Sequence, residues 1–263
     1  MPPVALTIAG SDPSGGAGIQ ADLKTFHQWG VYGEAVVTLL TVQNTRGVTR
    51  VEPLAAELVL AQLQAVLDDI PPHAAKTGAL GSAEIVSGLA QLVPSFTFPL
   101  VVDPVMISKH GHRLLSPAAE QVLKDKLLPH TFLLTPNVPE AEVLSNVAIE
   151  TERDVEEAAR RIGSLGCRAV LVKGGHLPGE PHDVLWQHGV IHVFEGSRVA
   201  TASTHGAGCT YSAAITANLA RGHDLEHSVT LAKAFIQRAI ETAPGLGSGY
   251  GPLNHFAART PHE

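Results

Sequence analysis

Ser203-Thr-His-Gly-Ala-Gly-Cys-Thr-Tyr-Ser-Ala-Ala-Ile215 is the stretch around which the rest of the chain is organised. It joins a tight glycine turn to an alanine-rich segment of high helix propensity that continues to about Leu219. The start of such a helix leaves backbone N–H groups without intrahelical acceptors, and the positive end of the helix dipole lies at the same point. The stretch therefore predicts an anion-binding turn, with an ordinary helix cap as the alternative.

Three residues of this turn suit chemistry on a bound anion. Gly206 and Gly208 have no Cβ, so an anion can approach the backbone closely and positive φ values cost little. Cys209 falls in the first helical turn, where the helix N-terminus favours the thiolate. We therefore expect an acidic thiol that serves as a base or nucleophile near neutral pH, although a buried structural cysteine is equally compatible with the pattern.

Short apolar runs alternate with helical patterns through most of the chain. The predicted strands cover 4–8, 35–41, 48–51, 73–77, 100–105, 132–134, 169–172, 184–187 and 190–194, with a hairpin turn at His188-Gly189. The predicted helices cover 19–29, 55–68, 82–92, 117–128, 154–165 and 225–242, together with the alanine-rich segment that opens after the turn 205–208 and continues to about 219. This alternation predicts one α/β domain spanning residues 1–263, with a mainly parallel sheet covered by helices on both faces.

Composition excludes several classes of function. The 263 residues are 44% apolar and carry a net charge of −7, which argues against nucleic acid or an anionic membrane as the main partner. No apolar run is long enough to cross a bilayer, and the first residues do not resemble a signal peptide. The two cysteines, Cys167 and Cys209, lack zinc-type spacing, so a reduced cytoplasm is expected. The alternate histidines within 109–112 are expected to be solvated rather than to bind a metal.

Polar residues near the first two predicted strands are candidates for binding a small substrate. The glycine-rich loop 10–18 matches neither the dinucleotide fingerprint nor the phosphate loop that ends in Gly-Lys-Ser/Thr. Its glycines would let a substrate approach the strand end, with Asp12 and Asp22 as acceptors, although Asp12 also suits a helix cap. Gln43 follows the second strand and can both donate and accept, which suits the edge of an aminopyrimidine or pyridine ring; a turn cap is the alternative.

Charged residues follow three later strands. Asp103 ends a buried strand, where an acid needs a partner or a cation, and a magnesium–phosphate neighbour would supply one. Asn137 and Glu140 are spaced either for a capping box or for a magnesium–water site. Lys173 precedes two glycines and could reach a phosphate, although a lysine in this position can also extend to solvent.

Seven stretches together resemble the hydroxymethylpyrimidine and phosphomethylpyrimidine kinases of thiamine biosynthesis, a branch of the ribokinase-like superfamily. They are Ala9-Gly-Ser-Asp-Pro-Ser-Gly-Gly-Ala-Gly-Ile-Gln-Ala-Asp-Leu-Lys-Thr-Phe26, Gln43-Asn-Thr-Arg-Gly-Val48, Asp103-Pro-Val-Met106, Leu114-Leu-Ser-Pro117, Thr135-Pro-Asn137 with Glu140, Lys173-Gly-Gly-His176 and Thr204-His-Gly-Ala-Gly-Cys209. The resemblance covers essentially the full chain. Cysteine at position 209 is specific, because most ribokinase-like sugar kinases have aspartate there.

The resemblance implies a ribokinase-like three-layer α/β sandwich. It also implies ATP-dependent phosphorylation of 4-amino-5-hydroxymethyl-2-methylpyrimidine, followed by phosphorylation of the monophosphate to the diphosphate. The cofactors would be ATP and Mg²⁺, and the enzyme would be a homodimer.

The resemblance also assigns roles to individual residues. The pyrimidine would be held by Gly10, Asp22, Gln43, Ala79 and Val105. The transferring phosphoryl group would be stabilised by the amides of Gly206, Ala207 and Gly208 and by Lys173, with Cys209 as the base. The nucleotide would lie near Thr204, Lys233 and Asn137. Magnesium would be bound, largely through water, by Asp103 and Glu140 with Asn137 nearby.

Two departures from the family and three rival functions remain. Ala207 stands where many relatives have threonine, which should be harmless because the backbone makes the contact. Ala79 stands where many relatives have methionine against the ring, which puts ring selectivity in doubt. Pyridoxal kinase activity is therefore the first alternative. An acyl-transfer enzyme with Cys209 as nucleophile and His205 beside it, or a ligand-binding protein without turnover, are the others.

Overall fold

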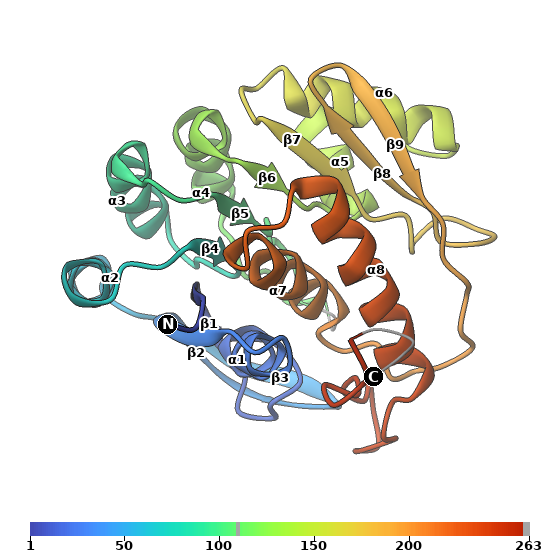
Figure 1. Ribbon diagram of the computed structural model, residues 1–263, viewed down its shortest axis with the longest axis horizontal. Helices are drawn as coiled ribbons and strands as arrows, with labels where there is room; N and C mark the ends of the chain where they lie inside the picture. The colour runs from blue at the N-terminus through green and yellow to red at the C-terminus, as the bar shows by residue number, and fades with distance from the viewer. Residues whose placement is uncertain (109–110, 260–263) are drawn as a thin grey trace.

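The computed structural model describes residues 1–108 and 111–259, and a nine-stranded sheet runs through that part of the chain (Figure 1). The strand order is β3-β2-β1-β4-β5-β6-β7-β8-β9. The strands are β1 (Val4–Ser11), β2 (Tyr32–Asn44), β3 (Gly47–Pro53), β4 (Ala74–Thr77), β5 (Leu100–Val102), β6 (Leu133–Leu134), β7 (Ala169–Val172), β8 (Asp183–Gln187) and β9 (Val190–Phe194). The six central strands of this order, β2, β1, β4, β5, β6 and β7, are parallel. Antiparallel pairing adds β3 at one edge and the β8–β9 hairpin at the other. The predicted mainly parallel sheet is confirmed.

Helices cover both faces of this sheet (Figure 1). They are α1 (Gly18–Gln28), α2 (Ala56–Asp69), α3 (Ala83–Leu92), α4 (Pro117–Val122), α5 (Val138–Ser145), α6 (Glu152–Gly163), α7 (Ala207–Ala220) and α8 (Leu225–Glu241). Within β5, Leu100 and Val102 pack in the core under α2 to α6, whereas Val101 packs in the core under α1, α7 and α8. Successive strand residues point to opposite faces, so a continuous apolar run serves both cores. The three-layer architecture matches the prediction.

The segment predicted as one helix over 117–128 is helical throughout but changes its winding. Helix α4 continues as a π-helix, Leu123–Leu127, and then as a 3₁₀ turn, Leu128–His130. Pro129 has no amide hydrogen, and its ring conflicts with the carbonyl four residues earlier, so a regular α-helix cannot continue through it. The side chains of Leu123, Leu127 and Leu128 are all buried. The proline therefore ends the regular helix, and the leucine side chains keep the segment packed in the core.

The predicted hairpin between β8 and β9 is confirmed. His188 and Gly189 connect the two strands with φ values of 49° and 84°. Two consecutive positive φ angles are typical of the tight turns that match the twist of paired strands.

Two further observations on residues 1–108 and 111–259 concern membrane-spanning helices and clusters of metal-binding side chains. No helix there is both long and apolar enough to cross a membrane. Within the same residues, no group of three or more histidine, cysteine, aspartate or glutamate side chains could hold a metal ion. Of the histidine segment 109–112, Lys109 and His110 lie outside the described residues.

Candidate active site

The glycine turn lies at the start of α7, and Gly206 is the residue that makes it possible. Its φ is 79°, and a Cβ at this position would lie 1.8 Å from the carbonyl oxygen of Gly16. Any side chain here would therefore push the turn away from the first loop. Ala207, Gly208 and Cys209 are each partly exposed. The start of α7 is thus packed on the loop after β1 yet remains accessible, as an anion-binding turn requires.

Lys173 and Asp103 meet at this turn. Lys173 Nζ lies 2.9 Å from Asp103 Oδ1, and a Cβ on Gly208 would lie 3.1 Å from that Nζ and 3.7 Å from Asp103 Oδ2. Burial acts to lower the pKa of Lys173, but the carboxylates of Asp103 and Glu140 raise it above its usual value. A permanently charged lysine therefore faces the first turn of the helix.

Asn137 and Glu140 form the capping box at the start of α5. Asn137 Oδ1 accepts from the amide of Glu140, and Glu140 Oε2 accepts from the amide of Asn137, both at 2.9 Å. Burial raises the pKa of Glu140 to about 7; Lys173 and backbone hydrogen bonds oppose this rise, and the nearby Asp103 adds to it. The cap is thus observed, and the same carboxylate also lies within the field of the Lys173–Asp103 pair.

The prediction of an acidic Cys209 thiol is wrong for this structure. Burial raises the pKa of Cys209 to about 11, and the negative charges of Asp22 and Asp103 act in the same direction. Lys76 and a hydrogen bond from the Gly18 amide lower it, but not enough. Although part of Cys209 remains exposed, the protein atoms around the sulfur and the two nearby carboxylates favour the neutral thiol, and together they outweigh the helix N-terminus.

Asp22 is enclosed by protein. Its Oδ1 lies 2.7 Å from Lys76 Nζ, and Oδ2 accepts from Thr7 Oγ1 at 2.6 Å. Both members of the Asp22–Lys76 ion pair have 0% side-chain exposure. The structure therefore places Asp22 behind the site rather than on its surface. Sequence reasoning missed Lys76, although a lysine near the end of a short buried strand is itself a signal.

The side chains of Asp12, His205 and Gln43 link the loop after β1 to the glycine turn before α7. His205 Nε2 lies 2.8 Å from Asp12 Oδ2 and 3.2 Å from the side-chain nitrogen of Gln43. A Cβ on Gly16 would lie 2.5 Å from His205 Cδ2, so the ring is packed tightly against the loop. Gln43, predicted from the second strand, is thus brought to the same turn as Cys209. The role of His205 as the connecting side chain was not predicted.

The other predicted substrate residues surround the end of β1. A Cβ on Gly10 would lie 2.5 Å from Leu39 Cδ1 on the neighbouring strand, so only glycine fits there without rearrangement. The carbonyl of Ala79 accepts from Thr38 Oγ1 at 2.6 Å. Val105 lies in the loop after β5 and is half-buried. Their role as ring contacts stays a prediction.

Lys233 and Thr204 are the other two residues that the family resemblance assigns to the nucleotide. Lys233 Nζ lies 2.6 Å from Asp183 Oδ2 and donates to the carbonyl of Pro181 at 3.0 Å. The other oxygen of Asp183 accepts from the amide of Gly174 at 2.9 Å, so Lys233 is tied to the glycine loop that follows Lys173. Thr204 lies just before the turn, and its carbonyl accepts from the amide of Ala207 at 3.3 Å.

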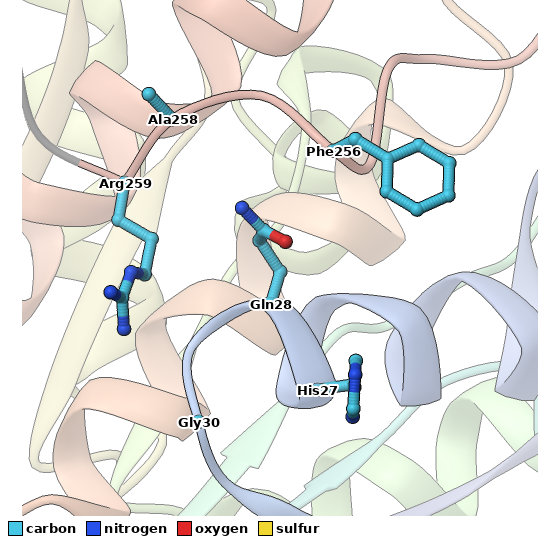
Figure 2. A pocket seen from close by; sticks show the side chains of 6 residues that line it. All are labelled: His27, Gln28, Gly30, Phe256, Ala258 and Arg259. Atoms are coloured by element: carbon cyan, nitrogen blue, oxygen red, sulfur yellow. The ribbon is translucent and has the colours of Figure 1, made fainter. Parts of the chain in front are cut away.

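A surface pocket of about 430 Å³ lies elsewhere (Figure 2). It is formed where the end of α1 meets the last described residues of the chain, and its lining consists of His27, Gln28, Gly30, Phe256, Ala258 and Arg259. None of the predicted site residues contributes to it. The chemistry-bearing residues gather instead at the carboxyl ends of the parallel strands, which is where α/β sheets bind their ligands.

Comparisons with known proteins point to the same chemistry. The phosphomethylpyrimidine kinase family model matches residues 12–254. The chain is 46% identical to the hydroxymethylpyrimidine/phosphomethylpyrimidine kinase of Synechococcus elongatus, over 97% of each protein. It is 47% identical, over 96% of its own length, to the thiamine biosynthesis bifunctional protein of Geobacter sulfurreducens, of which it spans 52%.

Solved structures agree on the fold. The pyridoxal kinase of Bacillus subtilis, solved as an ADP complex, matches with a TM-score of 0.91 and 38% identity, covering 98% of this chain and 99% of that one. The phosphomethylpyrimidine kinase of Clostridium difficile matches with a TM-score of 0.81 and 44% identity, covering 90% and 99%. The predicted ribokinase-like fold is thereby confirmed. These matches favour phosphoryl transfer over both the acyl-transfer and the binding-protein alternatives.

Proposed function

The chain belongs to the phosphomethylpyrimidine kinase family, and we propose that the turn at the start of α7 is the place where it transfers the phosphoryl group. The enzyme uses ATP to phosphorylate 4-amino-5-hydroxymethyl-2-methylpyrimidine and then its monophosphate, in thiamine biosynthesis. One observation supports this location. Lys173 Nζ lies against the backbone of Gly208, 3.1 Å from where a Cβ would be, and Gly208 immediately precedes Cys209.

The backbone of the turn and Lys173 would stabilise the moving phosphoryl group. The amides of Gly206 and Gly208 would supply fixed donors, and Lys173 adds a positive charge that burial does not remove. The Ala207 amide, the third predicted donor, already donates to the Thr204 carbonyl at 3.3 Å and would have to share its hydrogen. Phosphoryl transfer depends mainly on positioning and on stabilising charge on the equatorial oxygens. Donors that are already in place do not have to reorganise as that charge develops.

Cys209 would take the proton of the hydroxymethyl group. The substrate oxygen then bonds to the γ-phosphorus, the bond from that phosphorus to ADP breaks, and the proton remains on sulfur. With a pKa of about 11, roughly one thiol in 10⁴ is ionised at pH 7. Forming the thiolate therefore adds about 5 kcal/mol to the barrier in the unliganded site. Lys76 is the cation whose charge opposes that penalty.

Asp103 and Glu140 fit a magnesium ion. Their oxygen ligands are the kind that Mg²⁺ prefers. Burial is the main cause of the raised pKa of Glu140, and the negative charge of Asp103 adds to it, so a cation at this place would relieve both effects. Two carboxylates leave room for the waters that Mg²⁺ usually keeps. When bound, the ion would neutralise charge on the nucleotide phosphates.

The remaining predicted residues divide between the two substrates. Gly10, Gln43, Ala79 and Val105 would contact the pyrimidine ring, whereas Asp22 would act from behind the site through Lys76. The nucleotide would lie beside Thr204 and Asn137 and near the loop that Lys233 holds through Asp183. We also propose a cytoplasmic homodimer by family resemblance; sedimentation and cell fractionation would test both parts.

The test of this mechanism compares, in one variant, the phosphorylation of the pyrimidine alcohol with that of its monophosphate. In Cys209→Ala, single-turnover phosphorylation of the alcohol should fall about 10²- to 10⁴-fold, the usual contribution of a general base. Phosphorylation of the monophosphate should fall far less, because its attacking oxygen is already ionised. Cys167→Ala is the matched control, since that thiol is buried in the other core, and it should leave both rates unchanged. Equal losses for the two acceptors in Cys209→Ala would remove the base role.

Pyridoxal phosphorylation is a second candidate activity. It rests on the TM-score of 0.91 with the B. subtilis pyridoxal kinase and on the small side chain at Ala79, which narrows the ring site less than methionine would. Comparing kcat/KM for the pyrimidine and pyridoxal with ATP decides between a dedicated and a dual enzyme. An Ala79→Met variant should lower the pyridoxal value more than the pyrimidine value if ring size is read there.

A further inference from the structure

Three side chains form a continuous polar chain from the first loop to the proposed ring-binding residue. They are Asp12 in the loop after β1, His205 before the turn and Gln43 near the end of β2. The Asp12 and His205 side chains are each 4% exposed. Because these two groups are almost completely removed from water, the hydrogen bond between them is strengthened by the low local dielectric constant.

Asp12 is the fixed acceptor at one end of the chain. Its Oδ1 accepts from the amide and hydroxyl of Ser14, and its Oδ2 accepts from the amides of Gly16 and Ala17. Burial acts to raise the pKa of Asp12, but hydrogen bonds from His205 and Ser14 outweigh it and lower the pKa. An ionised carboxylate cannot donate, so the hydrogen of the 2.8 Å contact belongs to His205 Nε2.

The protonated Nε2 constrains Gln43. The Gln43 side-chain nitrogen lies 3.2 Å from Nε2, but an amide NH₂ is only a donor and cannot bond to a ring N–H. The amide oxygen and nitrogen have the same shape and are assigned by the hydrogen bonds that they make. If the Gln43 amide is rotated by 180°, its oxygen and nitrogen exchange places. Oε1 then accepts from His205 Nε2–H as a second acceptor beside Asp12, and the NH₂ group points away from His205.

We propose that Asp12 and His205 fix the Gln43 amide so that its NH₂ group faces the substrate ring and donates to an unprotonated ring nitrogen. The inference rests on the proposed function, because it takes Gln43 as a ring contact. Asp12 and His205 are positioning residues in this arrangement. The substrate class that follows is a six-membered nitrogen heteroaromatic with a free lone pair at that edge; a ring N–H there would meet a second donor.

The hydrogen position on His205 can be measured without any turnover. Two-bond ¹H–¹⁵N spectra of the histidine rings in the unliganded enzyme, assigned by the signal lost in His205→Phe, report which nitrogen carries hydrogen. We expect hydrogen on Nε2. A neutral ring protonated only at Nδ1 would overturn the inference, whatever the enzyme's substrate proves to be.

Two substrate analogues test the direction of the amide. In each, one of the two pyrimidine ring nitrogens is replaced by C–H. The wild-type enzyme should lose about tenfold in kcat/KM for one analogue only, the effect of one neutral hydrogen bond. That discrimination should disappear in Gln43→Met and in Gln43→Glu, since a carboxylate cannot donate. If Gln43→Glu keeps the discrimination, or if the wild type accepts both analogues as well as the parent, the NH₂ group does not face the ring.

Variants of the positioning residues complete the test. His205→Phe and Asp12→Asn should each reduce the discrimination by raising KM for the parent while changing kcat less, because the amide can then turn both ways. Ser14→Ala is the matched control, since it removes one hydrogen bond to Asp12 Oδ1 and leaves the Oδ2 contact with His205. Unaltered discrimination in both positioning variants would contradict their role. Failure of the wild type to phosphorylate the parent pyrimidine would instead refute the proposed function.

Discussion

Two lysine–aspartate pairs lie beneath α7 and differ mainly in their access to solvent. Lys76 and Asp22 are 2.7 Å apart with both side chains 0% exposed, whereas Lys173 and Asp103 are 2.9 Å apart with side chains 13% and 3% exposed. Each lysine stands near the carboxyl end of a parallel strand, β4 or β7. The first pair is enclosed, and the second meets the accessible turn at Gly208. Identical chemistry can therefore support the scaffold in one place and be available to a ligand in another.

The enclosed pair should dominate stability. Lys76→Met leaves Asp22 buried without its cation, and breaking a buried pair in this way costs about 3–5 kcal/mol of unfolding free energy. Urea denaturation would measure the loss. The double variant Lys76→Met with Asp22→Asn should recover much of it, because no unpaired charge remains. A loss below about 1 kcal/mol in the single variant would show that the two pairs do not differ as their exposures indicate.

The open pair should dominate catalysis. Lys173→Met removes a donor to the transferring phosphoryl group, so kcat for the pyrimidine should fall about 10²- to 10³-fold, the usual effect of losing one such donor. Its unfolding free energy should change less than that of Lys76→Met, because Asp103 keeps its hydrogen bonds from Thr135 and Ser212. Steady-state kinetics would measure the fall in kcat, and urea denaturation of the same preparation would measure the change in unfolding free energy. A near-normal kcat in Lys173→Met would show that the Lys173–Asp103 pair is not the catalytic one of the two.

The pH dependence of stability gives a further test, because Glu140 adds a second carboxylate beside the Lys173–Asp103 pair. Its pKa is about 7 in the folded protein and near 4.5 when unfolded, so the folded state binds the proton more tightly. The stabilisation is complete below pH 4.5 and is lost as pH rises through 7. Relative to Glu140→Gln, the wild type should lose up to about 3 kcal/mol across this range. Parallel stability curves for the two proteins would show that Glu140 does not titrate there.

A third pair, Lys233 with Asp183, gives the smallest effect. The side chains are 12% and 5% exposed, which resembles the open pair, but the lysine acts on the Gly174 loop through Asp183. Lys233→Met should raise KM for ATP by roughly fivefold, about 1 kcal/mol, with little change in kcat. Initial rates over a range of ATP concentrations would measure this. A large fall in kcat with unchanged KM would place Lys233 at the phosphoryl group instead.

Local patterns predicted the elements that carry the site. Glycine spacing and alanine content identified the start of α7, and short apolar runs identified the strands whose ends supply Asp103 and Lys173. The Asn137–Glu140 spacing predicted the capping box that the structure contains. These features depend on backbone geometry over a few neighbouring residues, which is why the sequence exposes them.

The electrostatic character of the site was not predictable in the same way. The Cys209 thiol was expected to be acidic from its place at a helix N-terminus, yet its pKa is raised to about 11. The groups that decide this value come from helix α1, strand β4 and the end of strand β5. Lys76 was missed as a member of the site, and the contacts of His205 with Asp12 and Gln43 were not predicted, because these partners are distant in the chain.

The sequence alone determined the alternation of strands and helices, the glycine turn that precedes α7 and the family of the enzyme. Only the tertiary structure decided which charges are enclosed, which remain accessible and that Asp12 and His205 lie within hydrogen-bonding distance. The physical reason is that backbone preferences are set by near neighbours, whereas the free energy of a charge depends on every group and every water molecule within several ångströms.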